Sequence, residues 1–412
     1  MASPLKPDEL ARYAEAMVRT TVSLRRDDDL IVIAEPAHRE LAVAVVEAAY
    51  RIGARSATVD YLDPLVRRAR LRLAPEKWLG YATPWNVKRL RSFGEPTTAT
   101  LYLVGEDEPH ALDGVDPARA AADAVGLFKQ LPWLHSKTWN ARRRWSIVGW
   151  PTEGWARQVY PSLQPRNAVR RLAKDLLWFC RLGPDDPPGW QGLQDHLAAV
   201  NRRTVRLTKL QLRGLELRGS STELSVGFPP EARFLGGKER NAHGIQISPN
   251  VPTEESFSTP DAVSTNGTFR CSRPLVFQGK LIEGLAGEFR NGRLVRLEAT
   301  GANGDFFRAY LALIRNADRL GEVALVDGSS RIGQTGRVYY NTLLDENATA
   351  HIAFGAGFDN TRRRQPGDRR ALGVNRSDAH IDVMIGTDEL EATGITARGK
   401  RIPLIRDGAW RI

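Results

Sequence analysis

The first half of the chain alternates between helical and strand-like patterns of hydrophobic residues. Apolar side chains at helical spacing predict an amphipathic helix over residues 8–22, and a short apolar run predicts a buried strand over 30–34. A helix ending at Gly53 and a second strand over 56–61 follow. Because strand–helix–strand successions close as right-handed parallel units, this half predicts an open α/β sheet. The order recurs as a strand over 99–104, a helix over 116–129 and a strand over 145–149.

The pattern changes in the second half. Two helices, over about 165–182 and 190–206, are followed by short segments of alternating polarity with Gly and Asn turns. We therefore expect the fold class α/β plus α+β, with an N-terminal α/β domain at 1–190 and a β-rich domain at 191–412. The second domain is predicted to contain strands at 209–212, 223–227, 244–247 and 293–297, interrupted by a helix near 304–319.

Composition narrows the class of protein only a little. With 412 residues, 42% hydrophobic and 26% charged, the chain is typical of a globular protein with more than one core. No stretch approaches the roughly 20 apolar residues of a membrane span, and the first residues lack the apolar run of a signal peptide. We therefore expect a cytoplasmic protein that does not bind membranes. Cys180 and Cys271 lie far apart and lack the spacing of metal ligands; one disulfide between them is the alternative to the free thiols that we expect.

The formal net charge of +11 raises the possibility of a nucleic-acid partner. The positive charge is spread along the chain, however, and no helix-turn-helix, zinc-finger or RNA-binding motif accompanies it. We interpret local clusters such as Arg142-Arg143-Arg144 as solvated surface arginines and expect no nucleic-acid partner.

Between residues 250 and 382, carboxylates and imidazoles repeatedly interrupt segments that otherwise have buried patterns. A charge in such a place is costly unless it is paired or bound to metal. His380 and Asp382 are two residues apart in a strand pattern, so both project from the same face. Glu322 and His351 each interrupt another apolar segment.

Each of these residues alone has an ordinary structural explanation. Glu322 could pair with an arginine, His351 could be a hydrogen-bonded core histidine, and the adjacent acids Glu254 and Glu255 could lie in a solvated loop. Together they supply nitrogen and oxygen ligands in a number suited to two divalent ions, which would activate a water for attack on a carbonyl.

Five sequence blocks stand out in the second half of the chain. They are Asn-x-Pro-Thr-Glu-Glu from Asn250, Leu-Gly-Glu-Val-Ala-Leu-Val from Leu320, Asp-Glu-Asn-Ala-x-x-His-Ile-Ala-Phe-Gly from Asp345, His-x-Asp-x-Met-Ile-Gly from His380 and Arg-Ile-Pro-Leu-Ile-Arg-Asp-Gly from Arg401. In this order the blocks resemble the M29 family of thermophilic-type metallo-aminopeptidases. The resemblance implies an α/β N-terminal domain before a β-rich, metal-binding catalytic domain, in a cytoplasmic dimer with two divalent metals.

The resemblance implies a homodimeric enzyme that releases N-terminal amino acids from peptide substrates. It implies two divalent metal ions as cofactors, which could be zinc, cobalt, manganese or magnesium. Glu346 is implied as general base or additional ligand, and Glu254 is an alternative to its neighbour in the ligand set. The implied metal ligands are Glu255, Glu322, His351, His380 and Asp382.

One position departs from the family. A tyrosine is expected seven residues after the histidine of the third block, and here that position is Phe358, which cannot stabilise an oxyanion. The departure keeps open a non-peptidase enzyme on the same scaffold, either an aromatic ring-cleaving dioxygenase or an aromatic aminohydrolase.

Overall fold

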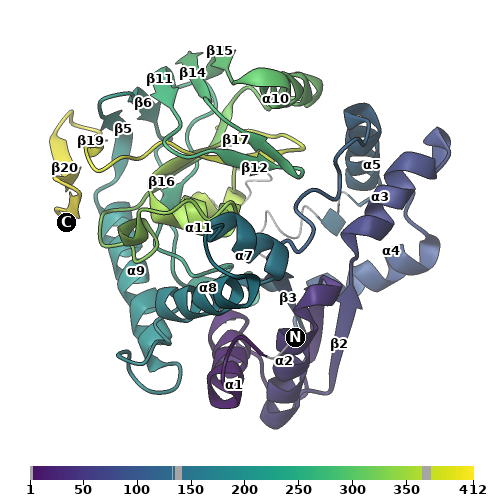
Figure 1. The fold of residues 1–412 in the computed structure, drawn as a ribbon. Helices are drawn as coiled ribbons and strands as arrows, with labels where there is room; N and C mark the ends of the chain where they lie inside the picture. Colours follow the sequence, from purple (N-terminus) through teal and green to yellow (C-terminus); the bar gives the residue numbers. More distant parts are fainter. Residues whose placement is uncertain (1–2, 132, 135–141, 364–372) are drawn as a thin grey trace. The chain divides into compact units, whose positions relative to one another are not determined.

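The computed structural model describes residues 3–131, 133–134, 142–363 and 373–412 and has a mixed α/β fold (Figure 1). Its contacts divide the chain into two compact units. The first unit contains residues 1–198 and 238–253, and the second contains 199–237 and 254–412. None of the helices in the described ranges is long and apolar enough to cross a membrane.

The first unit is built on a parallel sheet, as its sequence pattern predicts. The sheet has five strands in the order β2-β1-β3-β4-β9. Leu30 and Val32 alternate with half-buried residues along β1, so one face of the sheet enters the main core. The strands are β1 (Asp29–Ala34), β2 (Ser56–Tyr61), β3 (Thr98–Val104), β4 (Arg144–Gly149) and β9 (Asn250–Val251), and a separate pair joins β7 (Glu239–Arg240) to β8 (Gln246–Ile247).

Helices follow the strands of this unit. The predicted helix at 8–22 begins at Pro7 but continues after Ala16 as a turn of π-helix, Met17–Thr21. Gly53 ends α2 in the left-handed conformation, with φ of 96°, as its position in the sequence indicates. The helices are α1 (Pro7–Ala16), α2 (Arg39–Ile52), α3 (Pro64–Leu73), α4 (Pro84–Arg91), α5 (Pro117–Gln130), α7 (Glu153–Val159) and α8 (Pro165–Phe179), with α9 (Gln191–Lys209) crossing from this unit into the next.

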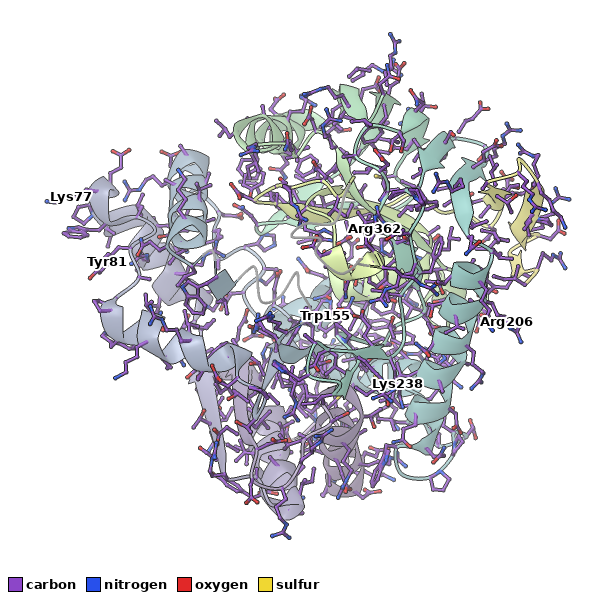
Figure 2. The ribbon with its side chains drawn as sticks, turned by 180° about the vertical axis from the view of Figure 1, so that it is seen from behind. Lys77, Tyr81, Trp155, Arg206, Lys238 and Arg362 are labelled. Atoms are coloured by element: carbon purple, nitrogen blue, oxygen red, sulfur yellow. The ribbon has the colours of Figure 1, made fainter. Side chains whose placement is uncertain are left out.

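The arginine cluster at the start of β4 corrects the sequence-based interpretation. Arg142 is exposed, as are basic residues elsewhere in the chain such as Lys77 and Arg206 (Figure 2). Arg143 and Arg144, in contrast, are buried. Arg144 forms an ion pair with Asp28 at 2.9 Å and also donates to backbone carbonyls. The prediction of a solvated cluster is therefore wrong for two of its three members, because a guanidinium has enough donors to satisfy several buried acceptors.

Glu35 follows directly after β1 and is expected to make stability depend on pH. Burial raises the pKa of its carboxyl from 4.5 to about 7, and neighbouring acids add to the shift. Because the folded pKa lies above the unfolded value, the folded state retains the proton longer, and stability is lost as the pH rises from about 4.5 to about 7.

The substitution Glu35→Gln should remove this penalty. Thermal unfolding at pH 8 should show a more stable variant, by up to about 2 kcal/mol, and at pH 4 the two proteins should be equally stable. Glu47→Gln, at an exposed position on α2, is the control. An unchanged difference across this pH range would contradict the assignment.

The second unit consists mainly of antiparallel sheets. An eight-stranded sheet has the order β15-β14-β11-β6-β5-β19-β20-β21, and a four-stranded sheet has the order β10-β16-β17-β18. Its elements are β5 (Leu212–Arg218), β6 (Glu223–Gly227), β10 (Ser256–Ser258), β11 (Asn266–Arg270), β12 (Leu275–Phe277), β13 (Lys280–Ile282), β14 (Ala286–Arg290), β15 (Arg293–Glu298), α10 (Gly301–Leu313), β16 (Leu320–Leu325), α11 (Thr342–Asp345), β17 (His351–Gly355), β18 (His380–Met384), β19 (Glu391–Thr396), β20 (Arg401–Arg406) and β21 (Ala409–Trp410).

Two predicted boundaries in this region are wrong. The segment 209–212 is not a strand, because α9 continues to Lys209 and Gln211 then turns the backbone with a φ of 49° before β5 begins. Helix α10 ends at Leu313 rather than near residue 319, and Asn316 adopts a left-handed conformation soon after it. Positive φ at these residues is a local turn that the hydrophobic pattern does not reveal.

Candidate metal centre

The register of the four-stranded sheet gathers the predicted residues on one face. Glu322 lies opposite Ala353, which lies opposite Asp382, and His380 lies opposite Gly355. Directly paired residues in antiparallel strands project to the same side. The sequence blocks that lie far apart in the chain therefore present their polar side chains to a common space, with small residues between them.

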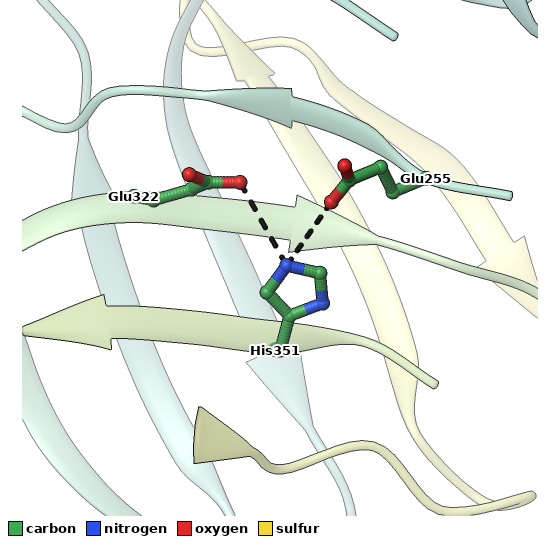
Figure 3. Close-up of side chains that lie close together, drawn as sticks. All are labelled: Glu255, Glu322 and His351. Atoms are coloured by element: carbon green, nitrogen blue, oxygen red, sulfur yellow. Dashed lines mark ion pairs between the residues drawn. The ribbon is translucent and has the colours of Figure 1, made fainter. Parts of the chain in front are cut away.

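Glu322 is central to this cluster. One of its carboxylate oxygens lies 3.7 Å from Nε2 of His351, and the other lies 3.3 Å from Nε2 of His380. Glu255 approaches the same nitrogen of His351 at 3.1 Å (Figure 3). On the far side, Asp382 lies 3.4 Å from Nε2 of His380. The carboxylate of Glu322 thus faces both imidazoles at once.

Backbone carbonyls orient the two imidazoles. Nδ1 of His351 lies 3.3 Å from the carbonyl oxygen of Thr349, and Nδ1 of His380 lies 2.7 Å from that of Ala356. Since a carbonyl can only accept, Nδ1 is the donor in each ring. The neutral imidazole then has its free electron pair on Nε2, which points into the cluster and is available to a metal.

The burial of these side chains makes their charge costly. Glu255 and Glu322 are each 4% exposed and His351 is 1% exposed. Burial raises the pKa of Glu255 above its ordinary value, in spite of the hydrogen bond to His351 that lowers it. Burial alone would lower the pKa of His351, but hydrogen bonds to Glu255 and Glu322 outweigh it and raise that pKa well above normal. Without cations, the cluster therefore holds protons that cations would displace.

Glu346 and Asn347 lie beside the cluster, just before β17. Burial, followed by the charges of Asp382 and Glu255, raises the pKa of Glu346 well above its ordinary value. Asn347 is fully buried and accepts a hydrogen bond of 2.7 Å from the backbone N–H of Glu254. Asn347 therefore holds the chain next to Glu255, a function not predicted from the sequence although the residue belongs to the third block.

The donor set fits divalent cations. Three combinations of potential ligand atoms each lie within 4.8 Å of one another in the described part of the chain. They contain all five predicted ligands and Glu346, while Glu254 belongs to none of the three. Nitrogen and oxygen donors without thiolates suit zinc, cobalt, manganese or magnesium. The combinations are Glu255-Glu322-His351, Glu322-His380-Asp382 and Glu346-His351-Asp382.

Phe358 lies next to the cluster, at the position where the sequence resemblance predicts a tyrosine. Its ring centroid is 4.9 Å from that of His380 in an edge-to-face contact and 5.5 Å from that of Phe257. The side chain therefore provides an apolar surface beside one imidazole and offers it no hydroxyl group.

Comparisons with known proteins identify relatives of the whole chain. A family model described as thermophilic metalloprotease (M29) matches residues 6–410. The chain is 35% identical to aminopeptidase T of Thermus thermophilus, with 97% of this chain and 98% of that protein covered. It is 30% identical to aminopeptidase PepS of Streptococcus thermophilus, with both chains covered completely.

A solved structure extends the likeness to three dimensions. The wild-type AmpT structure from Thermus thermophilus matches with a TM-score of 0.88 and 33% identity, covering 98% of this chain and 99% of that one. The relatives named here are aminopeptidases, which gives no support to a ring-cleaving dioxygenase or an aromatic aminohydrolase.

Proposed function

The chain belongs to the M29 family of thermophilic metalloproteases and is a metal-dependent aminopeptidase, and from this premise we propose a site that holds two divalent cations. The position of Glu322 is the observation that carries the proposal, because its two oxygens face two different histidines. One cation would be held by Glu255, Glu322 and His351, and the other by Glu322, His380 and Asp382.

The cations would polarise the scissile carbonyl and activate the attacking water. Glu346 is proposed as the general base that accepts a proton from this water. Its buried carboxylate lies among the proposed ligands, from where it would pass the proton to the departing amine. The carbonyl partners of His351 and His380 would keep both Nε2 atoms directed at bound cations.

Removal of metal is the direct test of this function. Hydrolysis of aminoacyl p-nitroanilides should fall at least about a hundredfold in a chelator and return with Co²⁺ or Zn²⁺. Metal analysis of the purified protein should find about two ions per chain. The proposed mechanism uses two cations together, to polarise the carbonyl and to activate the water. Full activity in protein shown to be metal-free would contradict the proposed site.

We further propose a cytoplasmic homodimer in which an N-terminal α/β domain, 1–190, precedes the metal-binding domain, 191–412. Helix α3 supports association, because its Leu65, Val66 and Leu73 are 46%, 67% and 81% exposed at helical spacing. Light scattering measures the mass directly, and a value near 45.8 kDa would contradict the dimer.

A further inference from the structure

We propose that a cavity in the first unit is a second ligand site, which binds a small phosphate monoester with an apolar body. The cavity has a volume of about 700 Å³, within the range of pockets that hold small molecules. Its lining residues belong to the first unit, whereas the potential metal ligands belong to the second. The site is therefore additional to the metal centre.

The topology of the parallel sheet places this cavity where open α/β sheets bind ligands. Strand β1 lies between β2 and β3, so the chain builds the sheet first to one side of β1 and then to the other. Such a reversal opens a crevice at the carboxyl ends of the two strands where it occurs, here β1 and β3. The cavity is lined from these ends, by Ala37 after β1, Asp107 after β3 and Trp150 after β4.

Unpaired arginines surround the cavity. Arg39 is the first residue of α2, and Arg166 and Arg170 lie in the first two turns of α8. None of these three guanidinium groups forms a hydrogen bond or an ion pair with another described residue. A guanidinium presents a planar fork of donors that matches phosphate oxygens, so the lining has the groups that a phosphate requires.

The acids of the lining are largely engaged elsewhere. Glu47 and Glu153 each form an ion pair with the arginine four residues later in the same helix, at 2.8 Å and 3.7 Å. The carboxylate of Asp107 accepts from the backbone N–H of Gly154 at 3.1 Å. Glu40 has no such partner within the described ranges. Three unpaired arginines against one unpaired acid make the cavity a site for an anion.

The start of helix α8 gives an independent reason for an anion here. Its N-cap, Gln164, forms no side-chain capping hydrogen bond, and its first turn contains no acid. The N-terminus of a helix carries partial positive charge, so Arg166 and Arg170 are unfavourable there and also repel each other. A bound phosphate would offset both effects, as anions do at helix N-termini.

The rest of the cavity accounts for the apolar body of the ligand. A group placed against this lining would lose apolar surface to water, a contribution that inorganic phosphate cannot make. The loops after β1 and β3, at 35–37 and 105–107, are not the glycine-rich loops that hold a dinucleotide, so we expect a single phosphate. The apolar lining residues are Leu10, Val43, Ala44, Trp150 and Val169.

Calorimetry with phenyl phosphate tests both halves of this ligand. The metal-loaded wild-type protein should bind phenyl phosphate at least about tenfold more tightly than inorganic phosphate, which has no apolar body. It should bind phenol, which has no negative charge, at least about tenfold more weakly than phenyl phosphate. Benzoate distinguishes a carboxylate site from a phosphate site, and tighter binding of benzoate than of phenyl phosphate would overturn the assignment.

Substitutions in the lining locate the binding. Arg166→Gln combined with Arg170→Gln should weaken the binding of phenyl phosphate at least about tenfold, because two charged donors are lost. Val43→Trp, from an exposed position on α2, should have the same effect by filling the cavity. Arg206→Gln removes an exposed arginine from α9, labelled in Figure 2, and should leave the affinity unchanged.

The variant Glu322→Gln separates this cavity from the metal centre, where a phosphate could also bind to the cations. Its affinity for phenyl phosphate should equal that of the wild-type protein, whether or not hydrolysis is lost. Loss of binding in Glu322→Gln would overturn the cavity as the site, and so would unchanged binding in both lining variants. An equal loss in Arg206→Gln would show a general effect of charge and would contradict the proposal as well.

Discussion

Replacement of Glu322 by glutamine is expected to abolish hydrolysis, with kcat/KM reduced by at least about a thousandfold. This carboxylate belongs to both proposed cation sites, so one substitution weakens both. Glutamine has nearly the same size but lacks the charge, and its amide nitrogen would face a histidine where an oxygen now lies. In the described part of the chain, Glu322 is the carboxylate with ion-pair distances of 3.7 and 3.3 Å to the two imidazoles, whereas Glu255 approaches one of them and Asp382 the other.

Metal analysis, rather than activity alone, makes this prediction specific. The Glu322→Gln variant should retain less than one ion per chain under conditions that load the wild-type protein, and its far-ultraviolet dichroism should be unchanged. Glu298→Gln, at the exposed end of β15, is the control for the same chemical change. Normal metal content in an inactive variant would show that Glu322 is not the shared ligand.

Replacement of Glu346 by glutamine should have the second largest effect. Loss of a positioned general base costs about 10²–10⁴-fold in rate, and the change should fall on kcat rather than on KM. The buried carboxylate lies among the proposed ligands and can accept and return a proton there, whereas an amide cannot perform this transfer. Because a buried side chain does not need a charge, the neutral glutamine can occupy this position.

The metal content of the Glu346→Gln variant distinguishes the two functions open to this residue. A general base can be removed with both ions retained, whereas loss of one ion would make Glu346 a ligand together with His351 and Asp382. Glu346→Asp, which keeps the charge but shortens the side chain, should recover part of the rate only in the first case.

The sequence predicted the parallel sheet of the first unit well, because its signals are local. Apolar runs such as 30–34 and a terminal glycine such as Gly53 act within one element, and the structure confirms both. Arg144 shows the limit of this reasoning. Its partners Val22, Pro96 and Asp28 are far away in sequence, so its burial depends on contacts that no local pattern contains.

The hydrophobic pattern indicated only part of the candidate site, again because its signals are local. Spacing in one strand placed His380 and Asp382 on a common face, but it could not show that β16 and β17 bring Glu322 and His351 to them. The approach of Phe257 to Phe358 depends on a fold that joins β10 to the loop after β17. Such distant pairings are set by the complete sheet register, and family motifs rather than hydrophobic periodicity indicated the ligands.

The proposed sharing of Glu322 between two cations has a consequence for how the enzyme would respond to metal supply. Two cations that use one side chain cannot bind independently, because the first one fixes the carboxylate and also repels the second. We expect two loading steps with separate affinities, visible in a metal titration followed by calorimetry. A half-loaded protein would then persist over a range of free cation concentrations, and its activity would follow the availability of the more weakly held ion.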